Sequence, residues 1–186
     1  MTIKNVFSSL CITLSIGLLV SCNTATKNNT EASTQTETAN TNNAQPLTSK
    51  MTKADKKKFY NASNEVVYEV KYKQDGFKLR TATSNLLWKI KLYDDKVKIS
   101  DNEENLDPYE IKMVGIYEAK LVRADKTIAR TSYDPELNQQ FVAAESDAQP
   151  DAYQVAYSPS LLITRITEIA KDQQDVLMKE LKDKGY

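Results

Sequence analysis

The sequence predicts an α+β fold in which a curled antiparallel sheet, or partial barrel, is followed by C-terminal helices packed on or in it. Between residues 58 and 131, apolar and charged residues alternate, as in strands with one buried face. This alternating pattern recurs with a period of about 20 residues. After residue 158, apolar residues recur instead at the spacing of a helix.

Two kinds of strand make up the repeat. The first kind reads Tyr68-Glu69-Val70-Lys71, Trp88-Lys89-Ile90-Lys91 and Tyr109-Glu110-Ile111-Lys112. The second kind begins Lys58-Phe59, Lys78-Leu79, Lys98-Ile99 and Lys120-Leu121. A slip of one residue would turn the charged side chains into the core, so the pattern specifies the register well.

Short turn sequences separate the strands. Residues 74–76 contain Asp75 and Gly76, which favour a tight hairpin turn, and residues 93–96 occupy the same place one repeat later. We therefore predict about eight strands, at residues 58–61, 66–72, 77–81, 86–92, 96–100, 109–113, 116–122 and 127–132.

The polar face of the predicted sheet is rich in lysine. Its lysines are Lys71, Lys78, Lys89, Lys91, Lys98, Lys112 and Lys120. Together they could meet anionic headgroups or glycans. The interspersed Glu69, Glu110 and Glu118 favour a soluble outer face with cross-strand ion pairs instead.

The C-terminal part is predicted to be helical. Asp134 and Pro135 form a helix start, which predicts a helix over residues 135–145. Residues 152–157 suit a short strand or a helical turn. Ser158, as a cap, and Pro159 begin a second helical region, whose apolar segment 161–169 we expect to plug or cover the curled sheet. The region could be one helix, or the polar residues 171–175 could divide it into two.

Repeated two-strand units followed by a buried apolar helix resemble the tubby C-terminal and LURP-one-related barrels. The resemblance covers roughly residues 58–181 and implies an antiparallel barrel wrapped around a central hydrophobic helix. Tubby domains bind phosphoinositides through basic residues. This chain has fewer predicted strands than the full barrel and an additional predicted helix at 135–145.

The N-terminus resembles the signal sequence of bacterial lipoproteins. Lys4 precedes an apolar stretch over residues 6–20, which is shorter than the ~20 residues of a stable membrane span. The stretch ends in Leu19-Val20-Ser21-Cys22, which resembles a lipobox. An uncleaved membrane helix and an ordinary cleaved signal are the alternatives. The lipoprotein interpretation implies removal of residues 1–21 and lipidation of Cys22.

The remaining chain divides into a tether and one domain. After Cys22, residues 23–50 are dominated by Thr, Asn, Ala, Ser and Gln, which predicts a disordered spacer. Residues 51–186 form the predicted globular domain, with β repeats over 51–133 and a helical part over 134–186. We expect a location in the cell envelope, at the outer membrane (periplasmic or surface face) if the source has two membranes.

Composition argues against several functional classes. The chain has 25 basic and 25 acidic residues, with a basic excess in 51–133 and an acidic excess in 134–186. The two parts could dock against each other, or the first could form an anion-binding sheet. The positive charge is too sparse for a nucleic-acid partner. The chain has no histidine, and neither of its two cysteines would remain as a free thiol in the mature protein.

We therefore predict no catalytic residue, no cofactor and no metal site. The acidic segment 101–107 could offer oxygen ligands to calcium, but Leu106 stands where an EF-hand loop needs glycine. A solvated hairpin turn is the better interpretation of this segment.

We expect a non-enzymatic binding or envelope-structural module, held to the membrane through Cys22, with an envelope protein or a lipid as its partner. The alternative is a carrier of a lipid or another apolar ligand between the sheet and the C-terminal helix. Its cavity would be lined by Trp88, Ile90, Tyr109, Ile111, Leu162 and Ile166. Direct packing of the four sheet residues on the two helical ones would leave no room for a ligand.

Overall fold

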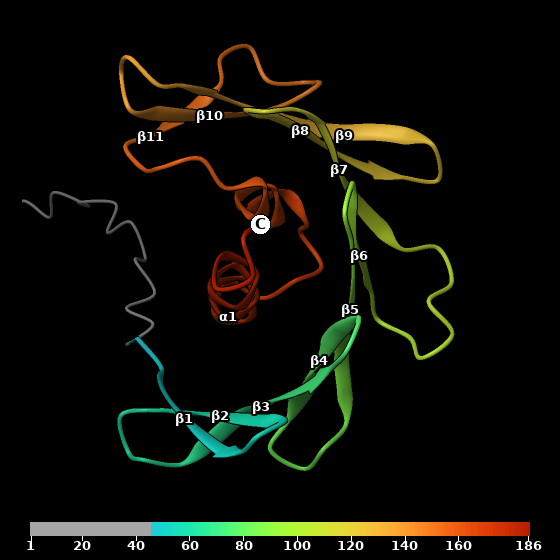
Figure 1. Cartoon of the computed structure of the whole chain (residues 1–186), viewed down its shortest axis with the longest axis vertical. Coiled ribbons are helices and arrows are strands. Elements are labelled where there is room, and N and C mark those ends of the chain that lie inside the picture. The colour runs from blue at the N-terminus through green and yellow to red at the C-terminus, as the bar shows by residue number, and fades with distance from the viewer. Residues whose placement is uncertain (1–45) are drawn as a thin grey trace, which may run out of the picture. The chain divides into compact units, whose positions relative to one another are not determined.

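The computed structural model describes residues 46–186, in which one antiparallel sheet encloses two short helices (Figure 1). The predicted signal peptide, Cys22 and most of the predicted tether lie outside the described residues. The sheet has eleven strands in chain order, and each strand is hydrogen-bonded to the one before it. The 3-10 helix η1 (Pro159–Arg165) and the α-helix α1 (Lys171–Lys182) follow the last strand.

The strands are joined by tight turns and by a few longer loops, of which the longest spans residues 101–108. The strands are β1 (Thr48–Lys53), β2 (Lys56–Tyr60), β3 (Val66–Lys73), β4 (Gly76–Thr81), β5 (Leu86–Tyr93), β6 (Lys96–Ser100), β7 (Tyr109–Gly115), β8 (Glu118–Arg123), β9 (Lys126–Asp134), β10 (Gln139–Ala144) and β11 (Asp151–Tyr153).

The sheet curls around η1 and α1 without closing, because β1 and β11 are not paired with each other (Figure 1). The curled antiparallel sheet with a C-terminal helix confirms the predicted fold class in outline. The predicted number of about eight strands is wrong, since β1, β10 and β11 were not among them. β1 also begins at Thr48, inside the range predicted as tether, and the neighbouring Leu47 packs against the core.

The predicted helix over residues 135–145 is wrong. Asp134 does accept hydrogen bonds from the backbone N–H groups of Glu136 and Leu137, as a helix cap would. Asn138 then adopts a left-handed conformation with φ 49°, and the chain turns back along β9 as β10. Within β10, Gln140 and Val142 point into the core, so the alternation of a strand prevails over the helix start signal.

The C-terminal region forms two helices, which is one of the two alternatives that the sequence left open, but the break lies outside residues 171–175. The polar residues 171–175, predicted as the interruption, form the first turn of α1, and residues 166–170 separate the helices. The Ser158 side chain does not cap η1. Its hydroxyl donates instead to the backbone carbonyl of Tyr186, 2.7 Å away.

The core lies between the inner face of the sheet and these two helices. Leu162, Ile163 and Ile166 from the η1 region are fully buried, as are Leu177 and Leu181 from α1. Complete burial of such side chains stabilises the fold by about 1.5–3 kcal/mol each. The helical region therefore occupies the interior of the curled sheet, as its apolar sequence predicted.

Candidate anion-binding face

The six residues predicted to line a ligand cavity come together in one buried hydrophobic cluster. Its members include Trp88, Ile90, Tyr109, Ile111, Leu162 and Ile166. The most exposed of them, Trp88, has only 7% of its surface accessible. Their place in one core cluster is the arrangement expected without a ligand between these six side chains, and the carrier hypothesis remains a prediction.

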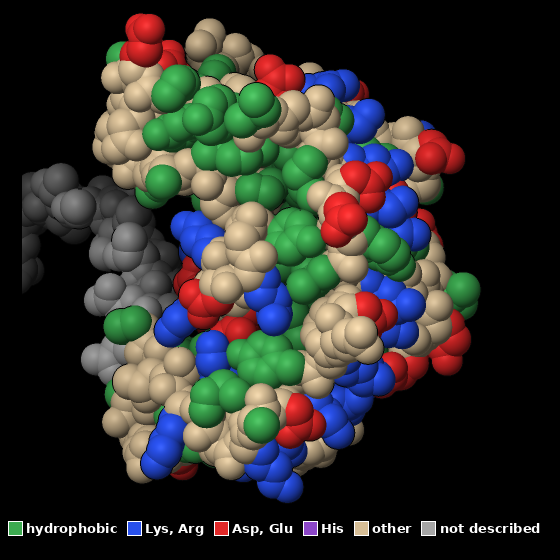
Figure 2. Space-filling model, in the orientation of Figure 1, with side chains coloured by type: hydrophobic (Ala, Val, Ile, Leu, Met, Phe, Trp, Pro, Cys, Tyr) green, Lys and Arg blue, Asp and Glu red, His purple; other side chains and the backbone are tan. Residues whose placement is uncertain are grey.

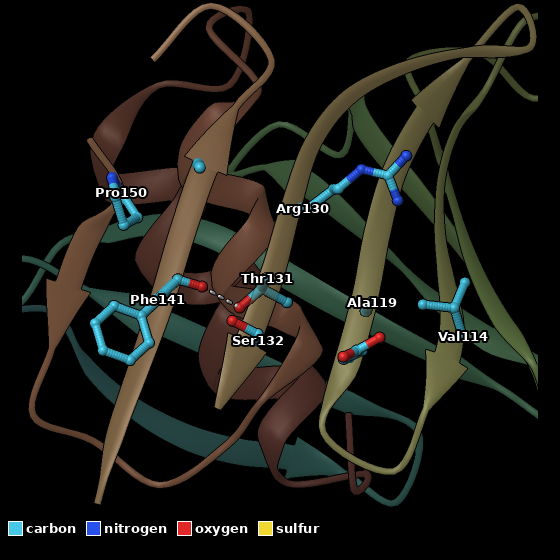
Figure 3. Close-up of a pocket in the computed structure, with 9 residues that line it drawn as sticks. Val114, Ala119, Arg130, Thr131, Ser132, Phe141 and Pro150 are labelled. Carbon is cyan, nitrogen blue, oxygen red and sulfur yellow. Dashed lines mark hydrogen bonds between the residues drawn. The ribbon is translucent and has the colours of Figure 1, made fainter. Parts of the chain in front are cut away.

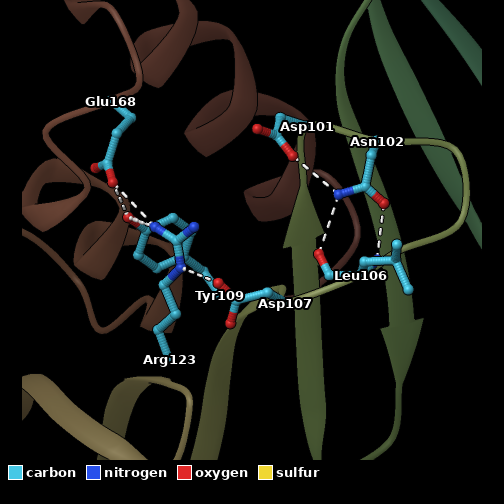
Figure 4. Close-up of polar contacts among 7 residues, drawn as sticks. All are labelled: Asp101, Asn102, Leu106, Asp107, Tyr109, Arg123 and Glu168. Carbon is cyan, nitrogen blue, oxygen red and sulfur yellow. Dashed lines mark hydrogen bonds and ion pairs between the residues drawn. The ribbon is translucent and has the colours of Figure 1, made fainter.

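Aromatic residues at the same position of successive repeats donate hydrogen bonds to the C-terminal segment. The hydroxyl of Tyr68 donates to Asp172 over 2.6 Å, and the indole N–H of Trp88 donates to Gln173 over 2.7 Å. Tyr109, in the third repeat, donates to Glu168 (Figure 4). Desolvation, followed by the hydrogen bond to the carboxylate, raises the pKa of Tyr68 and of Tyr109 to about 12. The repeat therefore has a structural role on the inner face.

Ion pairs of Lys57 and Arg123 also join the basic and acidic parts of the chain. Lys57 donates to the buried carboxylate of Glu180 over 2.6 Å, and Tyr72 donates to the other oxygen of the same carboxylate. Burial alone would lower the pKa of Lys57, but its hydrogen bonds to Glu180 and Tyr72 outweigh burial and raise it. Arg123 pairs with Glu168 over 3.0 Å (Figure 4). Docking of the two parts thus accounts for some of the charge asymmetry in the sequence.

The acidic segment 101–107 is folded by its own hydrogen bonds. The side chain of Asn102 accepts from the backbone N–H of Leu106 over 2.7 Å, and Asp107 pairs with Arg123 over 3.0 Å (Figure 4). Glu103 pairs with Lys78 and with Arg80, and the hydrogen bond from Lys78 is the main reason that the pKa of Glu103 is lowered. Within residues 46–186, no group of three acidic, cysteine or histidine side chains is arranged to hold a metal ion.

The outer face of the sheet carries the predicted lysines, and the register aligns them in two rows across the strands. In the first row, residues directly opposite one another on β2 to β5 are Lys56, Lys71, Lys78 and Lys89. In the second row, on β6 to β9, they are Lys96, Lys112, Lys120 and Arg130. Lys91 and Lys98 face each other on β5 and β6, between the rows.

The acidic side chains of this face neutralise only part of the two rows. Glu69 pairs with Lys56 over 2.7 Å. Glu110 pairs with Lys98 and with Lys112, each over 2.9 Å. Partial burial would raise the pKa of Glu110, but the hydrogen bonds from the two lysines prevail and lower it to about 2. The cross-strand ion pairs that we predicted are therefore present at several positions of the outer face.

Six cations of the two rows and of the connection between them make no ion pair within the described part of the chain. They are Lys71, Lys89, Lys91, Lys96, Lys120 and Arg130. Lys120 stands between Lys112 and Arg130, with a like charge directly opposite on each side. Such pairs are destabilising, so the fold itself gains nothing from the charge at this position.

A hollow with a volume of about 180 Å³ lies beside the first row. Gly76 forms part of its wall, and a Cβ atom there would lie 2.0 Å from the carbonyl oxygen of Ile90, so the backbones of β4 and β5 approach closely. The hollow is lined on its charged side by Lys73, Lys78, Lys89, Lys91 and Asp75. Lys78 is already paired with Glu103, and the other three lysines face one carboxylate, so the hollow is a suitable place for an anionic group.

A second, wider groove of about 340 Å³ lies beside the second row (Figure 3). Arg130 belongs to both the row and the groove, while Val114, Phe141 and Pro150 make other parts of the wall apolar. Thr131 forms part of the wall too, and its hydroxyl donates to the backbone carbonyl of Phe141 over 2.8 Å. The groove therefore offers one cation, Arg130, and one carboxylate, Glu118, next to an apolar surface.

Several members of the basic face were not singled out from the sequence. Lys56, Lys96 and Arg130 complete the rows, and Gly76, which was predicted only as a turn residue, forms part of the wall of the hollow. The alternation of charged residues could have pointed to Lys56 and Lys96, which occupy outward positions of their strands. The pairing of one strand with the next, which makes the rows, has no signal in the sequence of a single strand.

No protein-family profile matches the chain, and neither curated proteins nor solved structures show significant similarity to it. Among the helices of residues 46–186, none has the length and apolar character needed to cross a membrane. The function is therefore argued from the geometry of the described residues and from the N-terminal sequence.

Proposed function

We propose that this protein is a lipid-anchored, non-enzymatic binding module of the cell envelope, and that the outer face of its sheet binds anionic ligands. The observation that carries the proposal is the alignment of basic residues in two cross-strand rows. Cations placed directly opposite one another cost stability. An anionic ligand would offset this repulsion, which gives the arrangement a physical reason.

The position of the acidic C-terminal part supports the same proposal. Its carboxylates Asp172 and Glu180 bond to side chains of the inner face, namely Tyr68, Lys57 and Tyr72. Both acidic residues belong to α1, which lies inside the curled sheet (Figure 1). The outer rows are therefore left for a ligand from outside the domain, which favours the anion-binding interpretation of the basic excess in residues 51–133.

The N-terminal sequence supports the anchor. Cleavage before Cys22 would leave an acylated cysteine, and acyl chains hold a protein to a bilayer at ~0.8 kcal/mol per buried methylene. The low-complexity residues between Cys22 and β1 would act as a spacer, with an expected span of about 30 Å for a flexible chain of this length. Such a spacer would let the domain stand away from the membrane.

The resemblance to tubby C-terminal and LURP-one-related barrels remains a prediction from the sequence, and no solved structure shows significant similarity to the chain. The open edge between β1 and β11 and the short η1 distinguish the present sheet from a closed barrel around one long helix. The resemblance supports a binding role and no particular ligand.

The anchor can be tested by expressing the full-length protein in bacteria supplied with radiolabelled palmitate. We expect labelled protein in the membrane fraction, and loss of the label in Cys22→Ser. Cys11→Ser is the matched control, because Cys11 would be removed with the signal peptide. Equal labelling of both variants, or an unlabelled wild type, would contradict the anchor.

Anion binding can be tested by titration calorimetry, with the full-length protein in neutral detergent micelles and tripolyphosphate as the probe. We expect binding that weakens steeply with salt, and a loss of at least fivefold in affinity in Lys89→Gln/Lys91→Gln, which removes two cations from the Gly76 hollow. Lys182→Gln/Lys184→Gln removes the same charge near the C-terminus and should bind as wild type. Absence of binding, or equal losses in the two double variants, would contradict the proposal.

A further inference from the structure

We infer that the anionic ligand is a flexible linear polyanion, which lies across the strands and follows the two basic rows around the convex side of the sheet. This inference rests on the proposed function and narrows it to one class of ligand. It is carried by three features of the described residues, namely the spacing of the cations, their continuity and the curvature of the surface.

The spacing suits a polymer better than a single small anion. Neighbouring strands lie about 4.8 Å apart, so the four residues of the second row, from Lys96 to Arg130, extend over ~14 Å. The path from Lys56 on β2 to Arg130 on β9 crosses seven such steps, or ~34 Å along the sheet. One small anion reaches two or three of these cations, whereas a chain with a charge on each unit can reach all of them in turn.

The cations form a continuous path between the two rows. The first row ends at Lys89, and Lys91 is the next outward residue on the same strand. Lys91 faces Lys98 across β5 and β6. Lys98 and the second-row Lys112 share the carboxylate of Glu110, which places their ammonium groups close together. The Gly76 hollow opens beside this connection, where Lys78, Lys89 and Lys91 line it.

The curvature favours a polymer over a flat membrane surface. The helices η1 and α1 occupy the concave side of the sheet, so the rows lie on its convex side (Figure 1). Basic side chains are spread along this convex side, with acidic ones among them (Figure 2). A flat bilayer can touch a convex surface over a limited strip, whereas a flexible chain can bend with it and use both rows.

The side chains indicate that charge, and not the shape of each unit, is recognised. Lysine presents a compact point charge on a flexible stem, and only Arg130 among the row residues has the planar fork that binds phosphate or carboxylate in a bidentate manner. Many weak contacts on one chain add up because each later contact is intramolecular. The affinity should therefore depend strongly on the length of the polymer.

The experiment compares inorganic polyphosphates of about 3, 15 and 60 units, titrated into the full-length protein in neutral detergent micelles. We expect the affinity, expressed per phosphate, to rise at least tenfold from the shortest to the middle length. It should then level off, because a chain of the middle length already contacts the whole line of cations. Lys120→Gln/Arg130→Gln should remove most of this gain and leave tripolyphosphate binding at the Gly76 hollow unchanged. Lys182→Gln/Lys184→Gln should keep the full gain.

The outcomes separate this inference from the function on which it rests. If tripolyphosphate binds but the affinity per phosphate does not rise with the length of the polyphosphate, the inference of a polymeric ligand is wrong. The proposed anion-binding face would then still stand. Tighter binding to phosphatidylglycerol vesicles than to long polyphosphate at equal total charge would also overturn it, in favour of a membrane surface. A protein that binds none of these anions would overturn both.

Discussion

The two faces of the sheet come from the same strands and differ in how their polar groups are satisfied. On the inner face, Tyr68, Trp88 and Tyr109 each donate to a partner from the C-terminal segment, and Lys57 pairs with the buried Glu180. On the outer face, Lys71 and Lys120 face other cations and make no ion pair with a described residue. The inner-face groups named here have partners within the described residues, whereas Lys71 and Lys120 on the outer face have no anionic partner there.

This difference shows which residues serve the fold and which are available for binding. Buried polar groups must find partners because an unsatisfied one is costly, so the inner contacts are required by folding. Exposed lysines carry no such requirement, and an alignment of like charges works slightly against stability. Substitutions on the inner face should therefore lower the free energy of unfolding, and those on the outer face should alter anion binding.

The largest effect is expected in the core of the inner face. Leu162→Ala removes a fully buried side chain between the sheet and η1, and it should lower the free energy of unfolding by about 3–4 kcal/mol. Leu106→Ala is the matched control, because Leu106 is 66% exposed in the loop between β6 and β7. Urea denaturation measures both. Similar losses would show that the inner cluster is not the core of the domain.

The next effect concerns the charge that is buried on the inner face. Glu180→Gln leaves Lys57 without its main anionic partner, and we expect a loss of about 2–3 kcal/mol in urea denaturation. Asp183→Asn is the control, since this exposed carboxylate lies 3.7 Å from the same lysine nitrogen and should contribute little. A larger loss of unfolding free energy for Asp183→Asn than for Glu180→Gln would show that Asp183, and not Glu180, is the main anionic partner of Lys57.

A smaller and pH-dependent effect is expected on the outer face at Glu110. The pKa of this carboxyl is lowered from 4.5 to about 2 in the folded protein. Its stabilising effect is therefore complete above about pH 4.5 and is lost as the pH falls towards 2. Glu110→Gln should cost ~1 kcal/mol at pH 7 and almost nothing near pH 2. A cost that stayed the same at both pH values would exclude the ion pairs as its cause.

The smallest effect on stability should have the opposite sign. Lys120→Gln removes a cation that faces Lys112 and Arg130, so the free energy of unfolding should stay the same or rise by a few tenths of a kcal/mol. The same variant should bind long polyphosphate more weakly than wild type. Thermal denaturation with and without polyphosphate measures both effects. Marked destabilisation without ligand would mean that Lys120 serves the fold and not a ligand.

Strong local patterns predicted the middle of the molecule well. The repeats around Trp88 and Tyr109 predicted strands β2 to β9 because alternation over several residues has one simple explanation. Asp134 and Pro135 led to the wrong prediction of a helix over residues 135–145, because the same side-chain hydrogen bonds that begin a helix also stabilise a tight turn. β1 has few apolar residues, so it lacks the alternating pattern from which its hairpin with β2 could have been predicted.

The sequence by itself determined which side chains share a face of the sheet, since alternation along a strand depends on the pleat alone. It also provided the grounds for the predicted anchor at Cys22. The tertiary structure decided which residues stand opposite one another across strands, and so aligned Lys112, Lys120 and Arg130. It also decided that η1 and α1 lie inside the sheet. The alignment depends on the pairing of neighbouring strands and the position of the helices on contacts between residues far apart in the chain, and the pattern of a single strand contains neither.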